Sequence, residues 1–396
     1  MNAPAQKLTL RVHSSMDTIG REIWDACANP DASQHNPFLS YDFLHALEES
    51  GCATAETGWM PQHLVAEDKS GRILGVMPLY LKSHSQGEYV FDHGWANAYE
   101  QAGGDYYPKL QSSIPFTPVT GARMLVAPGE DTARIEAALL NGAIELVRQL
   151  GVSSLHITFL PEESWRRNGG GVMLQRTDQQ FHWLNDGYGS FDDFLGALAS
   201  RKRKALKKER REAVSAGGTF EHITGADITE AYWDVFFEFY QDTGSRKWGH
   251  PYLYREFFSK LGEVMADRVL LIMAKRDGRI IAGALNMIGG DTLYGRYWGA
   301  TEYHPYLHFE TCYYQAIDFA IAHGLRCVEA GAQGEHKLAR GYMPQTTYSL
   351  HYIAHPGLRR AVSAYLRQER TAIAHEVEIL NEMGPFRKNT DGDACG

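Results

Sequence analysis

The sequence predicts an α/β protein built from two tandem domains, each a mixed, mostly antiparallel sheet flanked by helices. The chain has 396 residues, 44% of them hydrophobic, which is enough for two domains with cores of their own. A β-hairpin pattern at residues 63–83 recurs at residues 269–290. A helix that ends at a glycine and precedes an apolar strand occurs at residues 137–160 and again at 311–331. This repetition indicates two copies of one fold.

The first copy begins with a strand and two helices. Residues 8–13 alternate as a strand does, and residues 17–27 have helical spacing. Ser40 can cap a second helix, which Gly51 can end. The turn at residues 68–71 then joins the two strands of the first hairpin.

A basic helical segment separates the two copies, and a second helical segment follows them. We therefore expect a first domain on the acceptor side (1–185), a basic connector (186–218), a second domain on the donor and catalytic side (219–355), a C-terminal helix (356–383) and a disordered tail (384–396).

Charge is concentrated locally. The chain has 39 basic and 48 acidic residues, a net charge of −9, which argues against DNA binding over the whole surface. The run SRKRKALKKERRE nevertheless has eight basic and two acidic residues. It is either a solvated helix face or a surface for phosphate groups, on tRNA or on a nucleotide-linked acceptor.

The five cysteines are scattered, and no pair has the spacing of a zinc site, so we expect no metal and a reduced, cytoplasmic setting. No stretch approaches eighteen consecutive apolar residues, and the first residues lack the pattern of a secretion signal. We therefore expect no membrane span.

Four blocks of the sequence, residues 90–125, 181–204, 243–253 and 296–344, resemble the FemAB-like branch of the GNAT (Gcn5-related N-acetyltransferase) superfamily. The last block includes RYWGATEYHPYLHFETCYYQ and EAGAQGEHKLARGYMP. The resemblance implies two tandem GNAT-like domains and the transfer of an acyl or aminoacyl group to an amine.

The chain departs from simple GNAT acetyltransferases, because no Gln/Arg-x-x-Gly-x-Gly/Ala loop precedes either central helix. Fem-type proteins also lack this loop and use aminoacyl-tRNA, so the resemblance implies aminoacyl-tRNA or acyl-CoA as a co-substrate and no permanently bound cofactor. The expected partners are a small-molecule or peptide amine acceptor and tRNA as the donor carrier. A non-catalytic module that binds a nucleotide- or sugar-linked ligand is the alternative.

The candidate catalytic residues lie around the second central helix and in the loop after it. They are Glu310, His308, Tyr314 and His336. Glu310 is the first choice for the base, because it shares a helical face with Tyr314 and acyl transfer needs a proton acceptor. Alternatively, Glu310 only complements the dipole at the helix N-terminus, and the tyrosines belong to the core.

The candidate donor-binding residues fall in two glycine-containing loops. Lys337 and Arg340 can hold a phosphate or carboxylate, unless this loop is an ordinary solvated one. Arg246, Lys247 and Trp248 suit a stacked base or a sugar, and equally a packed loop corner.

The candidate acceptor-binding residues are mostly in the first domain, in a polar and aromatic stretch. They are Asp92, Trp95, Tyr106, Tyr107 and Lys109, with Arg296 and Trp298 from the second domain. The stretch is either an acceptor-binding wall or a long structured loop whose aromatic side chains fill space between the domains.

Overall fold

The computed structural model describes residues 8–215, 218–248, 251–331 and 334–387. The chain divides into two compact units. Unit 1 contains residues 1–178, 252–264 and 346–374, and unit 2 contains residues 179–251, 265–345 and 375–396. The units are therefore discontinuous in sequence, unlike the contiguous ranges we expected. The reason is that β9 (Leu174–Leu184), β15 (Met343–Ile353) and α12 (Pro356–Glu382) each contribute residues to both units.

Unit 1 contains two sheets. The first has the strand order β1-β3-β4-β7, formed by Thr9–His13, His63–Glu67, Ile73–Met77 and Leu125–Val126. The second has the order β15-β8-β6-β5-β2, in which the last four strands are Ser154–Leu160, Lys109–Ser112, Tyr80–Lys82 and Trp59–Pro61. In this second sheet β6 and β8 run parallel, while β5–β6, β2–β5 and β8–β15 are antiparallel.

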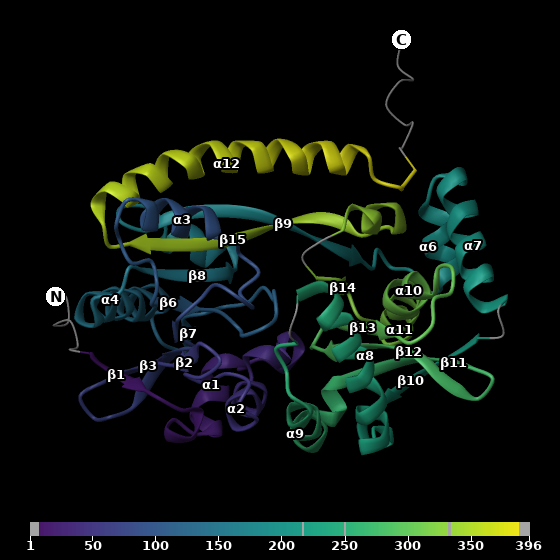
Figure 1. The fold of residues 1–396 in the computed structure, drawn as a ribbon, viewed down its shortest axis with the longest axis horizontal. Helices are drawn as coiled ribbons and strands as arrows, with labels where there is room; N and C mark the ends of the chain where they lie inside the picture. The colour runs from purple at the N-terminus through teal and green to yellow at the C-terminus, as the bar shows by residue number, and fades with distance from the viewer. Residues whose placement is uncertain (1–7, 216–217, 249–250, 332–333, 388–396) are drawn as a thin grey trace, which may run out of the picture. The chain divides into compact units, whose positions relative to one another are not determined.

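The helices of unit 1 are α1 (Arg21–Ala28), α2 (Tyr41–Glu49), α3 (His93–Gln101), α4 (Thr132–Leu150), α5 (Glu162–Asn168) and most of α9 (Arg255–Met265). The central helix α4 follows β7 and precedes β8 in the chain, and it lies beside β6 and β8 in Figure 1. The Asp131 side chain caps it by accepting from the backbone N–H of Arg134, and Gly151 ends it at a φ of 67°. Its apolar face, with Ile135, Leu139 and Ala143, packs in the main core of unit 1.

Unit 2 has one sheet with the strand order β10-β11-β12-β13-β14-β9. Its first five strands are Gly218–Thr224, Val269–Arg276, Arg279–Ile288, Thr292–Ala300 and Cys327–Glu329. Neighbouring strands are antiparallel except β13 and β14, which are parallel. The helices are α6 (Phe191–Ala197), α7 (Ser200–Ser215), α8 (Glu230–Trp248), α10 (Leu307–Phe309) and α11 (Gln315–Ala322), with a π-helical turn η6 (Glu310–Tyr314) and a 3₁₀ segment η7 (Glu335–Arg340).

The helix expected at residues 311–324 therefore begins earlier and changes type along its length, from α10 through η6 to α11. Its buried face, with Ile317 and Ala320, packs with Trp183, Phe194 and Leu206 in the core of unit 2. On the side of α8, β13 approaches the helix backbone closely at Gly299, where a Cβ atom would lie 2.2 Å from the carbonyl oxygen of Phe239. Only glycine fits this contact.

The α/β fold class is confirmed. Each unit contains a hairpin, a further strand, a central helix and a strand parallel to that further strand. These are β3–β4, β6, α4 and β8 in unit 1, where the short β7 also precedes the helix, and β11–β12, β13, α11 and β14 in unit 2. Ligand sites in open α/β sheets are favoured where the ends of parallel strands separate. The two parallel pairs, β6–β8 and β13–β14, are therefore the places to look for a site.

Candidate functional site

In unit 2 a cavity opens where the parallel strands β13 and β14 stop pairing. The paired residues end at Tyr294 and Glu329, and β14 ends there while β13 continues to Ala300. The cavity has a volume of about 90 Å³. We call it the β13–β14 cavity; its lining residues are Ala284, Leu285, Asn286, Gly295, Arg296, Tyr297, Trp298, His308, Cys312, Tyr313 and Ala330.

A β-bulge shapes one wall of this cavity. Leu285 pairs with Tyr297, but the next residue, Asn286, pairs with Gly295, so Arg296 is the extra residue of β13. The Arg296 Nη2 atom lies 2.7 Å from Glu329 Oε2, and both side chains are 3% exposed. Burial alone would raise the pKa of Glu329, but Arg296 and His182 outweigh it and lower the pKa to about 2. Arg296 thus carries a paired, permanent positive charge at the cavity wall.

Asn286 contributes a polar group without a partner to the same wall. The residue is 1% exposed, and its Oδ1 atom has no hydrogen-bond partner among the described residues. Its Nδ2 atom donates to the carbonyl oxygen of Leu270 at 3.3 Å. Because an unsatisfied buried acceptor is unfavourable, Oδ1 is suited to accept a hydrogen bond from a bound ligand.

Two histidines and a tyrosine, whose side chains can exchange protons, lie at this cavity or next to it. His308 lies over Trp298, with ring centroids 5.1 Å apart, and edge-on to Tyr313 at 5.4 Å. The Tyr313 hydroxyl lies 2.9 Å from His336 Nε2. Burial and, to a smaller extent, Cys312 raise the pKa of Tyr313, so its phenol stays protonated at neutral pH.

A second, larger hollow adjoins the cavity and shares Trp298 and His308 with it. Its volume is about 720 Å³. The other lining residues come from the segment between β13 and η6: Ala300, Thr301, Glu302, Tyr303, His304, Pro305, Tyr306, Leu307 and Phe309. Its walls are rich in aromatic rings, which suit a flat ring or a sugar.

Glu310 and Tyr314 share a helix face, as expected, but this face contacts α7 rather than the cavity. Glu310 is fully buried, and its carboxylate accepts from Arg210 and from Gln315 Nε2 at 2.8 Å. The Tyr314 hydroxyl donates to Glu209. Neither Glu310 nor Tyr314 lines the cavity, whereas the neighbouring Tyr313 does. The geometry therefore favours a structural function for Glu310, and not the function of the base, for which the sequence makes it the first choice.

Lys337 and Arg340 are also engaged within unit 2. Lys337 Nζ donates to the carbonyl oxygens of Ala330 and Gly331, at 2.6 and 3.0 Å, and so holds the turn after β14. Arg340 binds Glu209 and packs on the Phe309 ring. Both side chains thus hold segments of unit 2 near the β13–β14 cavity and do not line the cavity themselves.

The side chains of Arg246, Lys247 and Trp248, at the end of α8, lie outside the described part of the chain.

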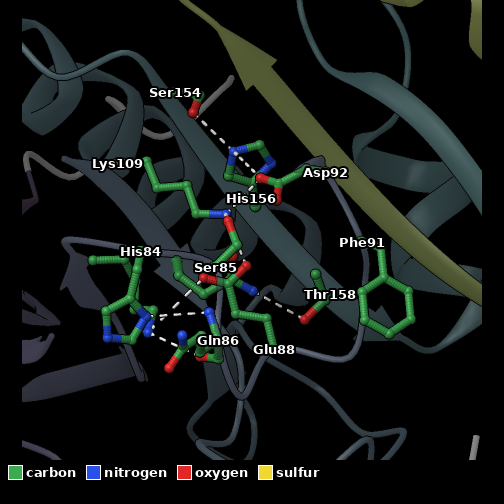
Figure 2. Close-up of polar contacts among 12 residues, drawn as sticks. His84, Ser85, Gln86, Glu88, Phe91, Asp92, Lys109, Ser154, His156 and Thr158 are labelled. Atoms are coloured by element: carbon green, nitrogen blue, oxygen red, sulfur yellow. Dashed lines mark hydrogen bonds and ion pairs between the residues drawn. The ribbon is translucent and has the colours of Figure 1, made fainter. Parts of the chain in front are cut away.

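In unit 1 the expected acceptor residues form a buried polar cluster instead of an open wall. Lys109 Nζ lies at its centre, 2.5 Å from Asp92 Oδ2, 2.7 Å from Glu88 Oε2 and 2.7 Å from Ser85 Oγ (Figure 2). The Tyr106 hydroxyl donates to Asp92 at 2.6 Å. Lys109 and Tyr106 are fully buried, and Glu88 and Asp92 are 2% exposed. We call Ser85, Glu88, Asp92, Tyr106, Lys109 and His156 the unit 1 polar cluster.

Two histidines extend this cluster toward β15. His156 Nε2 lies 2.8 Å from Ser154 Oγ, and His156 Nδ1 lies 2.7 Å from His351 Nδ1. Trp95 packs edge-on against His351, with ring centroids 5.0 Å apart. Of the other expected residues, Tyr107 joins through its hydroxyl, 2.8 Å from Ser85 Oγ.

Burial sets the protonation of this cluster. It raises the pKa of Glu88 to about 7, lowers that of Lys82 to about 6, and lowers that of His156 to about 3. For Asp92, burial acts upward, but the ammonium of Lys109 outweighs it and holds the pKa well below its usual range. The central pair is thus ionic, Asp92 against Lys109, beside a neutral His156.

The unit 1 polar cluster lies at the start of β6, beside the paired part of the two parallel strands. Gln111 on β6 donates from Nε2 to Thr158 Oγ1 on β8 at 3.1 Å, which ties the two strands together. Gln111 also pairs in register with His156. A side-chain hydrogen bond thus joins the parallel strands of unit 1, whereas the parallel strands of unit 2 border a cavity.

Sequence reasoning missed several of these residues. The sequence indicates Tyr314, whereas the neighbouring Tyr313 lines the cavity. Asn286 lies in an apolar strand with no motif around it. His156 and His351 are 195 positions apart, so only the pairing of β8 with β15 brings them together. Ser85 and Glu88 lie just before the block that begins at Val90, so a slightly longer block would have included them.

Among the residues that the structure describes, no cluster of three His, Cys, Asp or Glu side chains has metal-site geometry. None of the described helices is both long enough and apolar enough to span a bilayer.

The comparisons with known proteins agree on the fold. The model of the FemAB-like family, described as peptidoglycan biosynthesis/recognition, matches residues 15–388. Among solved structures, FemX superposes with a TM-score of 0.54 at 13% identity, over 90% of this chain and 100% of that chain. L-PGS from Bacillus licheniformis superposes with a TM-score of 0.51 at 9% identity, over 84% and 98%.

A tandem GNAT protein from the clavulanic acid biosynthesis pathway aligns with a TM-score of 0.44 at 14% identity, over 88% of this chain and 99% of that one. No sequence match to this chain is found among curated proteins. The topology of the two units and the superposition of FemX over most of the chain agree with two tandem domains, each a mixed sheet flanked by helices.

Proposed function

Because the chain belongs to the FemAB-like family, we propose that unit 2 transfers an acyl or aminoacyl group from an activated donor to an amine, at the β13–β14 cavity. One observation carries the proposal. Where the parallel strands separate, His308 and Tyr313 line a cavity whose wall also holds the unpaired acceptor of Asn286. The cavity can hold a small acyl group, and the adjoining hollow can hold part of its carrier.

The chemistry needs three functions. The neutral amine attacks the acyl carbonyl, a C–N bond forms, and the bond from the acyl carbon to the leaving oxygen or sulfur breaks. The nitrogen must lose a proton, the carbonyl oxygen must be stabilised as it gains charge, and the leaving group must gain a proton.

His308 is the proposed proton acceptor, because it lines both the cavity and the hollow. Tyr313 is the proposed donor to the carbonyl oxygen or the leaving group, since burial keeps its phenol protonated. His336, 2.9 Å behind the Tyr313 hydroxyl, can return a proton to it. Each group is a positioned acid or base of the kind that accelerates such a reaction by roughly a hundredfold to ten-thousandfold.

The proposed donors are aminoacyl-tRNA and acyl-CoA, which both carry phosphate groups. The basic face of α7 supports this choice. Its exposed cations are Arg201, Lys204, Lys207, Lys208 and Arg211. A local positive surface on a protein with a net charge of −9 attracts phosphate groups without binding polyanions everywhere. The proposed acceptor is the amine of a small molecule or a peptide.

The test is donor consumption. The purified protein is incubated with a panel of aminoacyl-tRNAs and acyl-CoAs together with amine acceptors, and the acylated amine is measured by mass spectrometry. We expect product from at least one donor class. Thermal unfolding with the same ligands is measured in parallel, and stabilisation without any product would instead identify a non-catalytic binding module.

A further inference from the structure

Helix α7 has a second, inward face with a different chemistry from its basic surface. Two adjacent residues, Glu209 and Arg210, are partly buried there, with side chains 16% and 24% exposed. They contact the segments that carry the proposed proton-transfer groups. Leu206 and Ala213 on the same helix are buried, which anchors α7 against unit 2.

Arg210 holds the helix that contains His308 and Tyr313. Its guanidinium donates to both oxygens of Glu310, from Nη2 at 2.8 Å and from Nε at 3.2 Å, and from Nη2 to Asp318 Oδ2 at 2.6 Å. The group also lies 4.2 Å above the centroid of the Phe191 ring. Because Glu310 is the first residue of the π-helical turn, this pairing fixes the turn where His308 precedes it and Tyr313 lies within it.

Glu209 holds the segment that contains His336. Its carboxylate accepts from the Tyr314 hydroxyl and from Arg340 Nη2 at 2.9 Å. Arg340 Nη1 in turn donates to the carbonyl oxygen of His336 at 2.6 Å, and its guanidinium lies 3.4 Å above the Phe309 ring. One carboxylate therefore links η6 to η7, the two segments that are also joined by the hydrogen bond between Tyr313 and His336.

We propose that Glu209 and Arg210 are positioning residues for the acyl transfer. They form a clamp on α7 that holds η6 and η7 together, and so set the geometry of His308, Tyr313 and His336. This inference rests on the proposed function of the β13–β14 cavity. Glu310, Tyr314 and Arg340 act in it as the points that the clamp grips, which explains why they lie near the cavity without lining it.

The expected effect follows from how sharply proton transfer depends on geometry. Without Glu209, Arg340 loses its carboxylate partner, and the backbone of His336 loses a fixed anchor. A misplacement of about 1 Å can lower the rate of an enzyme by about a hundredfold. Substrate binding depends mainly on other residues, so the loss should appear in kcat and not in KM.

The experiment compares Glu209→Gln and Arg210→Lys with Glu212→Gln. The control removes a carboxylate from the same helix, where Glu212 pairs only with the exposed Lys208 at 3.5 Å among the contacts of the described residues. We expect kcat to fall by about tenfold to a hundredfold in both clamp variants, with KM within about threefold of the wild type. Glu212→Gln should leave both constants within about twofold. Arg210→Lys keeps the positive charge beside the buried Glu310, which makes it the milder of the two clamp variants.

A second measurement follows the His336 imidazole signals by NMR through a pH titration. The clamp variants should shift the midpoint or the position of these signals, and Glu212→Gln should not. If kcat and the His336 signals are both unchanged in folded clamp variants, the clamp is refuted. If the wild type turns over no donor, the proposed function fails, and the His336 signals still decide whether the clamp exists.

Discussion

Each unit has a pair of parallel strands with a central helix between them in the chain, but the two pairs have different surroundings. In unit 2, β13 and β14 separate around a cavity of about 90 Å³ with an unpaired acceptor on Asn286. In unit 1, β6 and β8 are bridged by Gln111 and Thr158, and the unit 1 polar cluster surrounds Lys109 at the start of β6. The fold alone therefore does not decide where chemistry can occur. The side chains between the strands decide it.

The unit 1 polar cluster satisfies its own charges. Lys109 is fully buried among Ser85, Glu88 and Asp92, so it has exchanged water for three protein partners. A buried ion pair is weak evidence for stability, but the loss of one partner leaves an uncompensated charge. This cluster should thus matter for folding, while the cavity of unit 2 should matter for turnover.

The largest stability effect is expected at Lys109. Lys109→Met should lower the free energy of unfolding by about 3–5 kcal/mol, because Asp92 is left ionised and buried without its partner. Denaturant titration measures this loss. The exposed Lys69→Met is the matched control and should change it by less than about 0.5 kcal/mol. A loss below about 1 kcal/mol for Lys109→Met would break the contrast between a structural unit 1 cluster and a functional unit 2 cavity.

A somewhat smaller effect is expected from pH. The pKa of His156 is lowered from 6.5 to about 3, so its stabilising contribution is complete above pH 6.5 and is lost as the pH falls toward 3. In this window the unfolded chain binds a proton that the folded chain does not, which corresponds to about 1.4 kcal/mol per pH unit. The charged or titratable groups around His156 are those of Asp92, Tyr106, Lys109, Arg176 and His351.

The measurement is the slope of the free energy of unfolding against pH, between pH 5.5 and pH 4.5, in the wild type and in His156→Gln. The variant should show a shallower slope by about one proton. Equal slopes would mean that His156 is protonated in the folded protein, and the cluster would then not be the closed ionic network described above.

The smallest effect is expected on the basic face of α7. Neutralising the exposed Arg201, Lys204, Lys207 and Lys208 together should weaken the binding of tRNA by about tenfold at low salt and reduce its salt dependence. Each lost phosphate contact lowers the slope of log K against log salt by about 0.7–0.9. Fluorescence anisotropy at several salt concentrations measures both. Unchanged affinity at all salt concentrations would make this face a solvated one, and would leave the cavity without its proposed carrier contact.

The sequence predicted the architecture well, because hairpin turns and helix caps are local. Gly151 at the end of α4, and the turn at Asp277 and Gly278, have chemistry that depends on neighbouring residues alone. The boundaries of the units were harder to predict, since β9 and β15 are continuous strands with no change of composition where they pass from one unit to the other.

For the candidate site in unit 2, the sequence predicted which segments come together better than which residues face the cavity. The expected segments around His308 and His336 do meet, and both histidines lie at the cavity or behind it. Which face of the helix points to the cavity could not be predicted, because it depends on the packing of α7 against Glu310 and Tyr314, about 100 positions away. The acceptor residues expected in the first domain lie together, whereas Arg296 and Trp298 lie at the cavity of unit 2. The burial of the first group depends on β8 and β15, which no local pattern reveals.

We expect acyl transfer to occur at the β13–β14 cavity and not at the unit 1 polar cluster. The direct test is kcat of His308→Gln and His156→Gln with the donor that the wild type consumes, both measured on folded protein. His308→Gln should lower kcat by about a hundredfold to ten-thousandfold, whereas His156→Gln should keep it within about threefold. A loss of turnover in His156→Gln with normal turnover in His308→Gln would contradict the account and place the chemistry in unit 1.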